Sequence, residues 1–272
     1  MASRPRGRTL RCPPVFDWRV YLLALALLLA AAAATWLVSL AKRDVSIVDS
    51  VWGAMLVVAA VSYAWPLENV TARGALVLAI VALWALRLSV YITWRNWGEG
   101  EDYRYREIRR RNEPNFALKS LYVVFGLQAV LAWVVSAPLL AAQLSAAPLG
   151  ALDWLGLALA TFGLLFESVA DWQLARFKAG GDNRGRVLDR GLWRYSRHPN
   201  YFGECCVWWG IACFGLEPGG FWSLVSPLLM TFLLLRVSGV TLLERDIGER
   251  RPAYGDYVAR ISAFVPWRPR RA

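Results

Sequence analysis

The sequence contains few of the residues that build metal centres and disulfide frameworks. It has one histidine and four cysteines, and three of these, Cys205, Cys206 and Cys213, lie in a single apolar stretch without a CxxC spacing. A structural zinc site needs four cysteine or histidine ligands, and a disulfide framework needs regularly spaced pairs of cysteines. The sequence therefore predicts neither, and we interpret the cysteines as small apolar core residues.

Charged residues are also scarce. They make up 19% of the chain against 57% hydrophobic residues, and the mean hydropathy is +0.36, which is too apolar for a soluble domain. The net charge of +11 is carried by segments between long apolar runs, where membrane proteins concentrate Lys and Arg. It therefore does not indicate a nucleic-acid partner. No Gly-rich motif joins a strand to a helix, which excludes a Rossmann domain and a P-loop.

Seven apolar windows of roughly 20 residues predict an all-α, polytopic membrane bundle with about seven transmembrane helices. The predicted spans are Val20–Leu40, Ile47–Trp65, Ala75–Trp94, Leu118–Leu144, Leu149–Phe177, Tyr201–Leu216 and Phe221–Leu243. We expect a basic N-terminal tail at 1–19, the bundle at 20–243 with a cofactor loop at 176–200, and a C-terminal tail at 244–272.

Lys and Arg are distributed unevenly between the two sides of the predicted bundle. The loops after the first, third and fifth spans and the C-terminal tail carry nearly all of them, whereas the loops of the opposite side offer almost only Arg73. Because positively charged loops remain in the cytoplasm, this predicts a cytoplasmic C-terminus and an N-terminus outside. The N-terminal arginines, at positions 4, 6, 8 and 11, contradict this orientation, which therefore depends on the other loops.

Ionisable and hydrogen-bonding side chains occur inside the apolar spans. They are Asp49 in the second span, Arg87, Tyr91 and Arg95 in the third, Glu167 and Asp171 in the fifth, Asn200 and Glu204 in the sixth and Arg236 in the seventh. A charge at this depth costs about 2.5–3.5 kcal/mol on insertion scales, so each needs a partner or a function. Interhelical ion pairs would explain the arginines of the third span, whereas so many acids at one depth favour a polar cavity.

A basic segment precedes the sixth span. Residues 176–198 include seven basic residues against two acids, and Pro199 follows directly. Proline opens helices readily, and the free amides and dipole of the helix after it attract anions. We expect Arg194, Arg197 and His198 to complete an anion site there, although a capping role for His198 would also fit.

The turn after this segment carries hydrogen-bonding side chains. Asn200 and Glu204 share one helix face, where they could bind a sugar or an amide, and Tyr195 and Tyr201 could stack on a ring. The segment therefore predicts a site for an anionic cofactor with a ring.

The string Arg-His-Pro-Asn-Tyr-Phe-Gly-Glu ends at Glu204, and further matching segments are Ile47–Gly53, Arg95–Tyr105, Arg251–Tyr257 and Ser262–Trp267. These segments resemble the steroid 5-alpha-reductase family, in particular its bacterial branch of membrane proteins. The resemblance implies a seven-helix bundle in the bacterial inner membrane that holds NADPH in a cytoplasm-facing cavity. It also implies reduction of the carbon–carbon double bond of a lipophilic, steroid-like or isoprenoid-like enone taken from the bilayer.

The resemblance also implies roles for individual residues. Those that match the family's NADPH contacts are Asp171, Lys178, Asn200, Glu204 and Arg236, and Tyr91 falls near its carbonyl-binding tyrosine. The family's eukaryotic reductases activate the carbonyl with an adjacent Gln-Glu pair in the second span, which this chain lacks. Asp49 is the nearest acid in that span and Glu68 follows it, so the sequence leaves both open as the replacement.

Two other functions fit the same sequence. Isoprenylcysteine carboxyl methyltransferases share an Arg-His-Pro-x-Tyr-like string, followed by a glutamate and paired tyrosines that Glu244, Tyr254 and Tyr257 could match. Their cofactor, S-adenosylmethionine, carries no phosphate and needs less positive charge than residues 176–198 supply, so charge favours NADPH. A non-catalytic protein that binds anionic lipid headgroups through the basic face is the third hypothesis.

Overall fold

The fold is described from a computed structural model, which covers residues 16–67, 69–180, 183, 185–237, 239–240, 244 and 254–270. Within these ranges the secondary structure is helical and contains no β-strand. The predicted all-α fold class is therefore confirmed.

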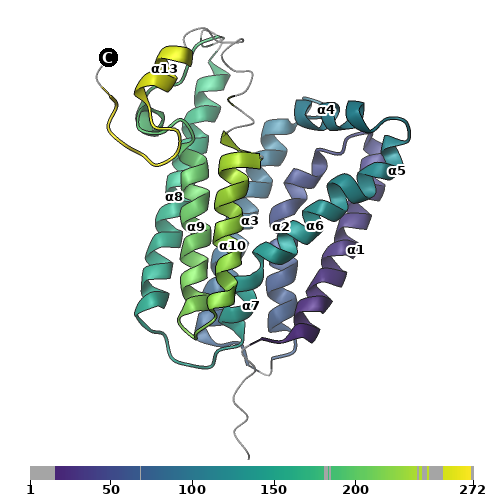
Figure 1. Ribbon diagram of the computed structural model, residues 1–272, viewed down its shortest axis with the longest axis vertical. Coiled ribbons are helices and arrows are strands. Elements are labelled where there is room, and N and C mark those ends of the chain that lie inside the picture. Colours follow the sequence, from purple (N-terminus) through teal and green to yellow (C-terminus); the bar gives the residue numbers. More distant parts are fainter. Residues whose placement is uncertain are drawn as a thin grey trace, which may run out of the picture.

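The N-terminal half begins with three long helices that run alternately up and down the bundle (Figure 1). They are α1 (Trp18–Lys42), α2 (Ile47–Ala64) and α3 (Ala72–Asn96). Asp17 caps α1 by accepting the backbone N–H of Arg19 at 2.9 Å, and Thr71 caps α3 by accepting that of Gly74 at 3.1 Å. Both caps satisfy amides that lack a partner in the first turn of a helix.

The chain next forms a short helix across the end of the bundle, α4 (Tyr103–Asn112), and returns through one apolar run, Phe116–Gln143 (Figure 1). This run consists of α5 (Phe116–Ser120), the π-helical turn η1 (Leu121–Gly126), α6 (Leu127–Val135) and α7 (Ala137–Gln143). Pro138 accounts for the break before α7, because proline lacks an N–H and is tolerated in the first turn of a helix.

The C-terminal half is built on α8 (Ala151–Ala179) and α9 (Pro199–Leu216), which pack along most of their length. The last apolar run combines η4 (Phe221–Leu224), α10 (Val225–Phe232) and η5 (Leu233–Val237). The short element η3 (Gly191–Arg194) packs beside the last turns of α8, where Trp193 Nε1 donates to the Ala170 carbonyl at 3.0 Å. The short helix α13 (Tyr254–Arg260) lies at the same end of the bundle (Figure 1). Pro199 opens α9, as the sequence predicted.

Each of the seven predicted spans coincides with a helix or a helical run. Five are long and apolar enough to cross a membrane: α1, α2, α3, the run Phe116–Gln143 and α8. The sixth, α9, opens with polar residues, and the described part of the seventh ends at Val237, so Phe221–Val237 counts as a shorter apolar helix. The predicted end of that span, at 241–243, lies outside the described residues.

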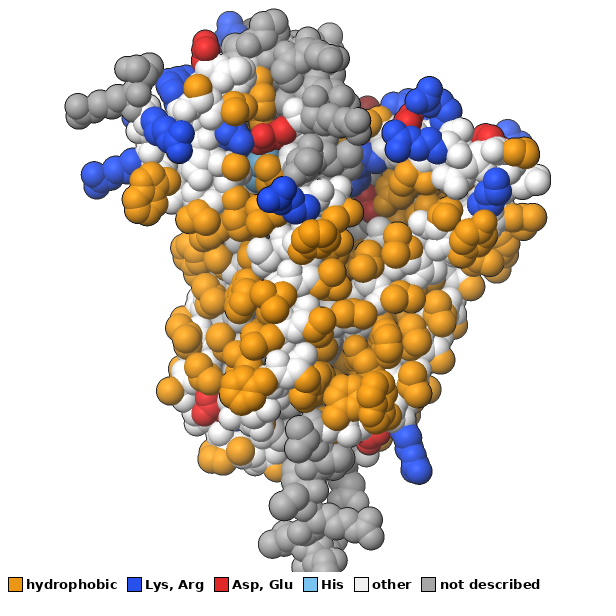
Figure 2. Space-filling view, viewed as in Figure 1, with side chains coloured by type: hydrophobic (Ala, Val, Ile, Leu, Met, Phe, Trp, Pro, Cys, Tyr) orange, Lys and Arg blue, Asp and Glu red, His pale blue; other side chains and the backbone are white. Residues whose placement is uncertain are grey.

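The surface of the bundle is divided by polarity. Figure 2 shows an apolar belt around the middle, with Lys and Arg gathered at the end that carries α4 and α13. The belt includes exposed leucines such as Leu83, Leu86 and Leu165, which a water-soluble protein would bury. We call the end that carries α4, η3 and α13 the basic end. The chain is a polytopic helical bundle of the membrane-protein type.

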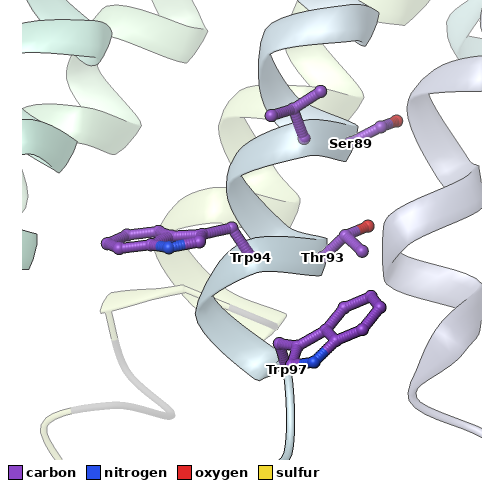
Figure 3. A pocket seen from close by; sticks show the side chains of 5 residues that line it. Ser89, Thr93, Trp94 and Trp97 are labelled. Carbon is purple, nitrogen blue, oxygen red and sulfur yellow. The ribbon is translucent and has the colours of Figure 1, made fainter.

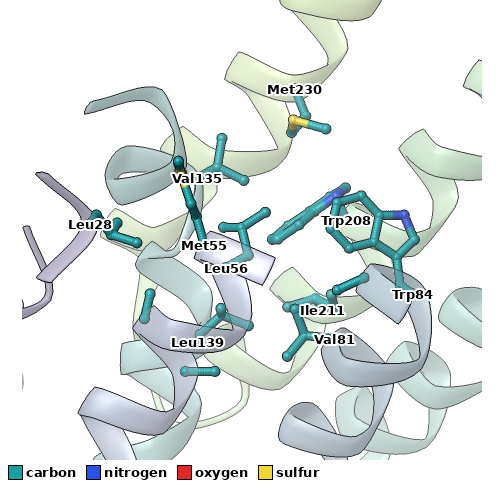
Figure 4. Close-up of a cluster of buried hydrophobic side chains, with 14 of the residues drawn as sticks. Leu28, Met55, Leu56, Val81, Trp84, Val135, Leu139, Trp208, Ile211 and Met230 are labelled. Carbon is teal, nitrogen blue, oxygen red and sulfur yellow. The ribbon is translucent and has the colours of Figure 1, made fainter. Parts of the chain in front are cut away.

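The core of the bundle is apolar and tightly packed. Leu56 and Val81, from α2 and α3, lie beside Leu139 and Ile211 from the C-terminal half, and none of these is exposed (Figure 4). Helices from both halves of the chain therefore share one core.

Arg73 requires a correction to the sequence-based assignment. The sequence analysis counted it in a loop, but it lies in the first turn of α3 and is only 1% exposed. Its Nε and Nη2 donate to the two carboxylate oxygens of Asp153, each at 2.8 Å, at the end of the bundle opposite the basic end. A buried charge is stable only with a partner of this kind, and the partner is 80 residues away in the sequence.

Candidate functional site

Five polar residues from three helices meet inside the bundle near the basic end. They are Arg87 of α3, Glu167 and Asp171 of α8, and Asn200 and Glu204 of α9, which we call the buried polar cluster. Arg87 Nη1 donates to Asp171 Oδ2 at 2.6 Å, and Nη2 donates to Glu167. Asn200 Nδ2 donates to the other oxygen of Asp171 at 3.1 Å. The polar residues that the sequence placed on separate spans are thus in contact.

Glycines explain why α8 and α9 approach closely at this level. A Cβ at Gly203 would lie 2.6 Å from the backbone N of Glu167, and a Cβ at Gly163 would lie 2.5 Å from the carbonyl oxygen of Gly203. Gly156 and Gly210 leave similar space further along. Small residues at such positions let membrane helices pack backbone to backbone, which brings Glu167 and Glu204 onto a shared interface.

The buried polar cluster satisfies only part of its hydrogen-bonding capacity. Arg87 Nε, Glu167 Oε2 and Asn200 Oδ1 are buried and have no hydrogen-bond partner among the described residues. Glu204 is 8% exposed, and its carboxylate makes no hydrogen bond within the described part of the chain. Buried polar groups are nearly always paired, so these atoms indicate a place where a ligand with both donors and acceptors can bind.

Tryptophans lie beneath the cluster. Trp84 precedes Arg87 by three residues on α3, and Trp208 follows Glu204 by four on α9, so each lies about one turn deeper on a similar face. Their rings meet edge to face with centroids 5.3 Å apart (Figure 4). Trp52 of α2 meets Trp84 with centroids 6.0 Å apart. All three indole N–H groups are buried and have no partner in the described part of the chain. We call Trp52, Trp84 and Trp208 the aromatic floor of the cluster.

Two tyrosines border the cluster. Tyr91 lies one turn beyond Arg87, is half-buried, and interacts electrostatically with Asp171 and with Arg95, whose guanidinium is 6.0 Å from the ring centroid. Tyr201 is stacked on His198 with centroids 5.6 Å apart and an interplanar angle of 1°. Tyr91, predicted to bind a carbonyl, and Tyr201, predicted to stack on a ring, thus lie beside the buried polar cluster.

Arg197 and His198, which were predicted to bind an anion, contact the carboxylate of Glu244 in this structure. Arg197 donates to both carboxylate oxygens of Glu244 at 2.7 and 2.9 Å, and His198 Nε2 lies 2.8 Å from the first of these. Tyr254 also donates to Glu244, at 3.3 Å. Burial raises the pKa of Glu244, but hydrogen bonds from His198 and Arg197 and their charges lower it more, so the net pKa lies below its ordinary value.

Backbone contacts reinforce this junction. Tyr257 of α13 donates to the carbonyl of Trp193, the Arg197 N–H donates to the Ser262 carbonyl at 2.9 Å, and Ser196 Oγ donates to the Phe264 carbonyl at 2.7 Å. We call the contacts between residues 193–198 and residues 244 and 254–267 the C-terminal clasp. The sequence analysis missed it, because Glu244 was considered only as a match to methyltransferases.

Asp49 lies at a different junction. Its carboxylate accepts a hydrogen bond from Arg104 at 2.7 Å and another from the Tyr105 hydroxyl, so it links α2 to α4. Burial and the adjacent Asp49 carboxylate raise the pKa of Tyr105 well above its ordinary value. Arg104 also interacts electrostatically with Tyr201, which places this junction next to the buried polar cluster. Glu68, the other acid considered, lies outside the described residues.

The remaining predicted cofactor residues are exposed at the surface. They are Lys178 near the end of α8, Arg194 in η3 and Arg236 in η5. They carry positive charge around the basic end, whereas the cluster itself contains more acids than bases. In the described ranges no group of His, Cys, Asp and Glu is arranged to hold a metal ion.

Two surface depressions lie outside the cluster. An apolar groove of about 420 Å³ follows the outer side of α3 and is lined by Ser89, Val90, Thr93, Trp94 and Trp97 (Figure 3). A polar depression of about 350 Å³ lies between residues 185–189 and α13. Within the buried polar cluster, the side chains of Glu167 and Asp171 are buried, whereas that of Arg87 is 18% exposed.

Comparison with known proteins places the chain in one family. The chain belongs to a family described as "Protein of unknown function (DUF1295)", whose pattern matches residues 35–261. It is similar to an uncharacterized protein of Schizosaccharomyces pombe, with 25% identity over 266 residues, covering 85% of this chain and 75% of that protein. No solved structure matches the chain. The matched range contains the buried polar cluster and most of the clasp.

Proposed function

We propose that the protein is a membrane-embedded, NADPH-dependent reductase that acts on the carbon–carbon double bond of a lipophilic enone. The observation that carries this proposal is the buried polar cluster. It joins Asp171, Asn200 and Glu204, for which the family resemblance implies cofactor contacts, and it leaves buried donors and acceptors unpaired. Its position between helices near the basic end suits a cofactor that enters from that side.

The residues present fit the two ends of NADPH. At depth, Asn200 Oδ1 can accept an N–H of the carboxamide and Arg87 Nε can donate to its carbonyl. At the surface, the exposed Lys178, Arg194 and Arg236 supply counter-charge for the phosphates. Arg197 and His198 support the site by holding the C-terminal clasp in place.

Reduction of an enone requires a hydride at the β-carbon and a proton at the α-carbon. NADPH, when bound, supplies the hydride with its electron pair and is left as NADP⁺, and the proton comes from water. Tyr91 would donate a hydrogen bond to the carbonyl oxygen, where negative charge builds as the enolate forms. Arg87 and Asp171 orient Asn200, and the apolar groove on α3 offers a surface for the hydrocarbon part of the substrate.

Ligand-dependent thermal stability tests the proposal. The detergent-purified protein would be titrated with NADPH and, separately, with S-adenosylmethionine, because a ligand that binds only the folded state raises the melting temperature. Asn200→Ala should weaken stabilisation by NADPH. Asn112→Ala is the matched control, since Asn112 lies at the basic end and its side chain donates to the Ile108 carbonyl within α4. The proposal fails if NADPH leaves the melting temperature unchanged, or if both variants respond like the wild type.

A methyltransferase is the second candidate, and the C-terminal clasp is the observation that favours it. Glu244 and Tyr254, which match the methyltransferase pattern, are in contact with Arg197 and His198. Stabilisation by S-adenosylmethionine alone, lost in Glu244→Gln, would replace the reductase proposal with this one. If neither cofactor stabilises the protein but anionic lipid does, the lipid-binding hypothesis would be the better account.

We also propose that the basic end faces the cytoplasm of a bacterial inner membrane. The Lys and Arg residues of α4, η3 and α13 support this orientation. A reporter enzyme that is active only outside the cytoplasm, fused after Ala272, should be inactive. An active fusion would reverse the orientation.

A further inference from the structure

The buried polar cluster contains more acids than bases, whereas the surface around it is basic. The cluster contains three acids, Glu167, Asp171 and Glu204, and one base, Arg87. The neighbouring charged groups do not remove the excess, because they are the bases Arg95 and Arg104 with the acids Asp49 and Asp102. The described interior at this level therefore has two more acids than bases, whereas the surrounding surface is strongly basic.

An excess of carboxylates is costly inside a bundle unless a positive group enters. Glu167 is 2% exposed and its Oε2 has no partner among the described residues. Trp84 and Trp208, whose rings pair edge to face, lie one turn along their helices from Arg87 and Glu204. A planar cation suits this place in two ways, since carboxylates attract its charge and indole rings favour cations. Unpaired acceptors and aromatic rings are independent features that indicate the same kind of ligand.

We propose that the buried polar cluster is selective for a cationic ring, so that the protein binds NADP⁺ more tightly than NADPH. This inference rests on the proposed function. The nicotinamide ring is neutral in NADPH and positively charged in NADP⁺, while the phosphates are the same in both. The charge distribution of the site, acidic at depth and basic at the surface, is complementary to the oxidised form.

This selectivity would make the protein's bound NADPH a stronger reductant than free NADPH. A tenfold tighter binding of the oxidised form lowers the potential of the bound two-electron couple by about 30 mV. The carboxylates would thus stabilise the positive charge that appears on the ring as hydride leaves. Glu204 and Glu167 act on this charge at a distance, while Asn200 and Arg87 hold the carboxamide.

Binding measurements with matched charged and neutral ligands test the inference. Dissociation constants for NADP⁺ and NADPH would be measured on the wild type, on Glu204→Gln and on Glu101→Gln. The control Glu101 is a carboxylate at the basic end that pairs with Arg109 and with the Val45 N–H. We expect the wild type and the control to prefer NADP⁺ by about tenfold or more, as one unit charge some 10 Å away implies at a dielectric constant of about 20. Glu204→Gln should lose most of this preference.

Small head-group probes separate failure of this inference from failure of the proposed function. 1-Methylnicotinamide carries the ring charge without phosphates, and nicotinamide is its neutral counterpart. Stabilisation of the wild type by the cation alone, lost in Glu204→Gln, supports a cation-selective cluster even if neither nucleotide binds. Equal effects of both probes, or tighter binding of NADPH than of NADP⁺, would overturn the inference while leaving a reductase possible. Folding of Glu204→Gln would be checked by its elution profile and its melting temperature without ligand.

Discussion

Replacement of Arg73 by leucine should destabilise the bundle severely. Arg73 donates to both oxygens of Asp153 at 2.8 Å, to Ser145 Oγ at 2.8 Å and to the carbonyls of Ala147 and Pro148. Neither side chain of the ion pair is more than 1% exposed, so the substitution leaves the Asp153 carboxylate buried without a counter-charge. Removing one partner of a buried pair costs about 3–5 kcal/mol. At about 2–4 °C per kcal/mol, the melting temperature should fall by about 6–20 °C.

The same ion pair can be tested by Asp153→Leu and by the double variant that combines Asp153→Leu with Arg73→Leu. Asp153→Leu should also be severely destabilising, because it leaves Arg73 without its counter-charge and removes the acceptor of the Gly150 N–H at the start of α8. The double variant should recover most of the loss, since no isolated charge remains. What it does not recover should correspond to the lost cap and to the hydrogen bonds from Arg73 to Ser145, Ala147 and Pro148.

Thermal unfolding in detergent, followed by tryptophan fluorescence, provides the measurement. Arg110→Leu is the control, because the Arg110 side chain is 78% exposed and pairs only with Glu107 on the surface of α4. Its expected change is below about 0.5 kcal/mol. The reasoning would be refuted if Arg73→Leu were as stable as the control, or if the losses of the two single variants simply added in the double variant.

Three further predictions concern the C-terminal half. Gly163→Ala should lower the melting temperature strongly and weaken cofactor binding, because its Cβ would lie 2.5 Å from a backbone carbonyl oxygen of α9. Gly255→Ala is the control. Its Cβ would meet nothing within 4 Å, so this variant should be neutral or slightly stabilising. The C-terminal clasp should become less stable as the pH is lowered. Because the pKa of Glu244 is lowered on folding, its contribution is complete above the ordinary pKa of about 4.5 and is lost as the pH falls through the folded value. Below pH 5 the melting temperature of the wild type should therefore fall more steeply than that of Glu244→Gln, and parallel curves would count against the clasp. Tyr257→Phe should cost about 1 kcal/mol and speed proteolysis after α13, since it leaves the Trp193 carbonyl without its donor, and an unchanged cleavage rate would contradict this.

The helices could be predicted from the sequence because lipid-facing spans have a strong local signal. The predicted third span, Ala75–Trp94, lies within α3, and the predicted fifth span ends two residues before α8 does. The interruptions were harder to predict. The π-helical turn at Leu121–Gly126 has no proline or glycine pair that would mark it, and its geometry depends on how the run packs against α1.

The site was predicted in its members but not in its contacts. Asp171, Asn200 and Glu204 could be selected because polar side chains are expensive in an apolar span. That Arg87 would pair with both acids of α8 depends on the distance between helices, which Gly163 and Gly203 determine and which no local pattern reports. Arg73 is a second example of a contact that the sequence does not reveal. A charged residue near the end of a predicted span is assigned to an exposed loop unless its buried partner, here Asp153, is known.

The segment Arg197–Glu204 has two separate roles. Its first residues, Arg197 and His198, hold Glu244 and so fix the C-terminal segment over the end of α9. Its last polar residues, Asn200 and Glu204, lie inside the bundle with unpaired atoms. The first half is therefore architectural, because it holds the C-terminal segment in place. In the proposed reductase, the preference for a cofactor head group would lie in what faces Asn200 and Glu204. In this chain those groups are Arg87, Glu167 and the aromatic floor, so substitutions there should change which form of the nicotinamide ring the proposed reductase prefers.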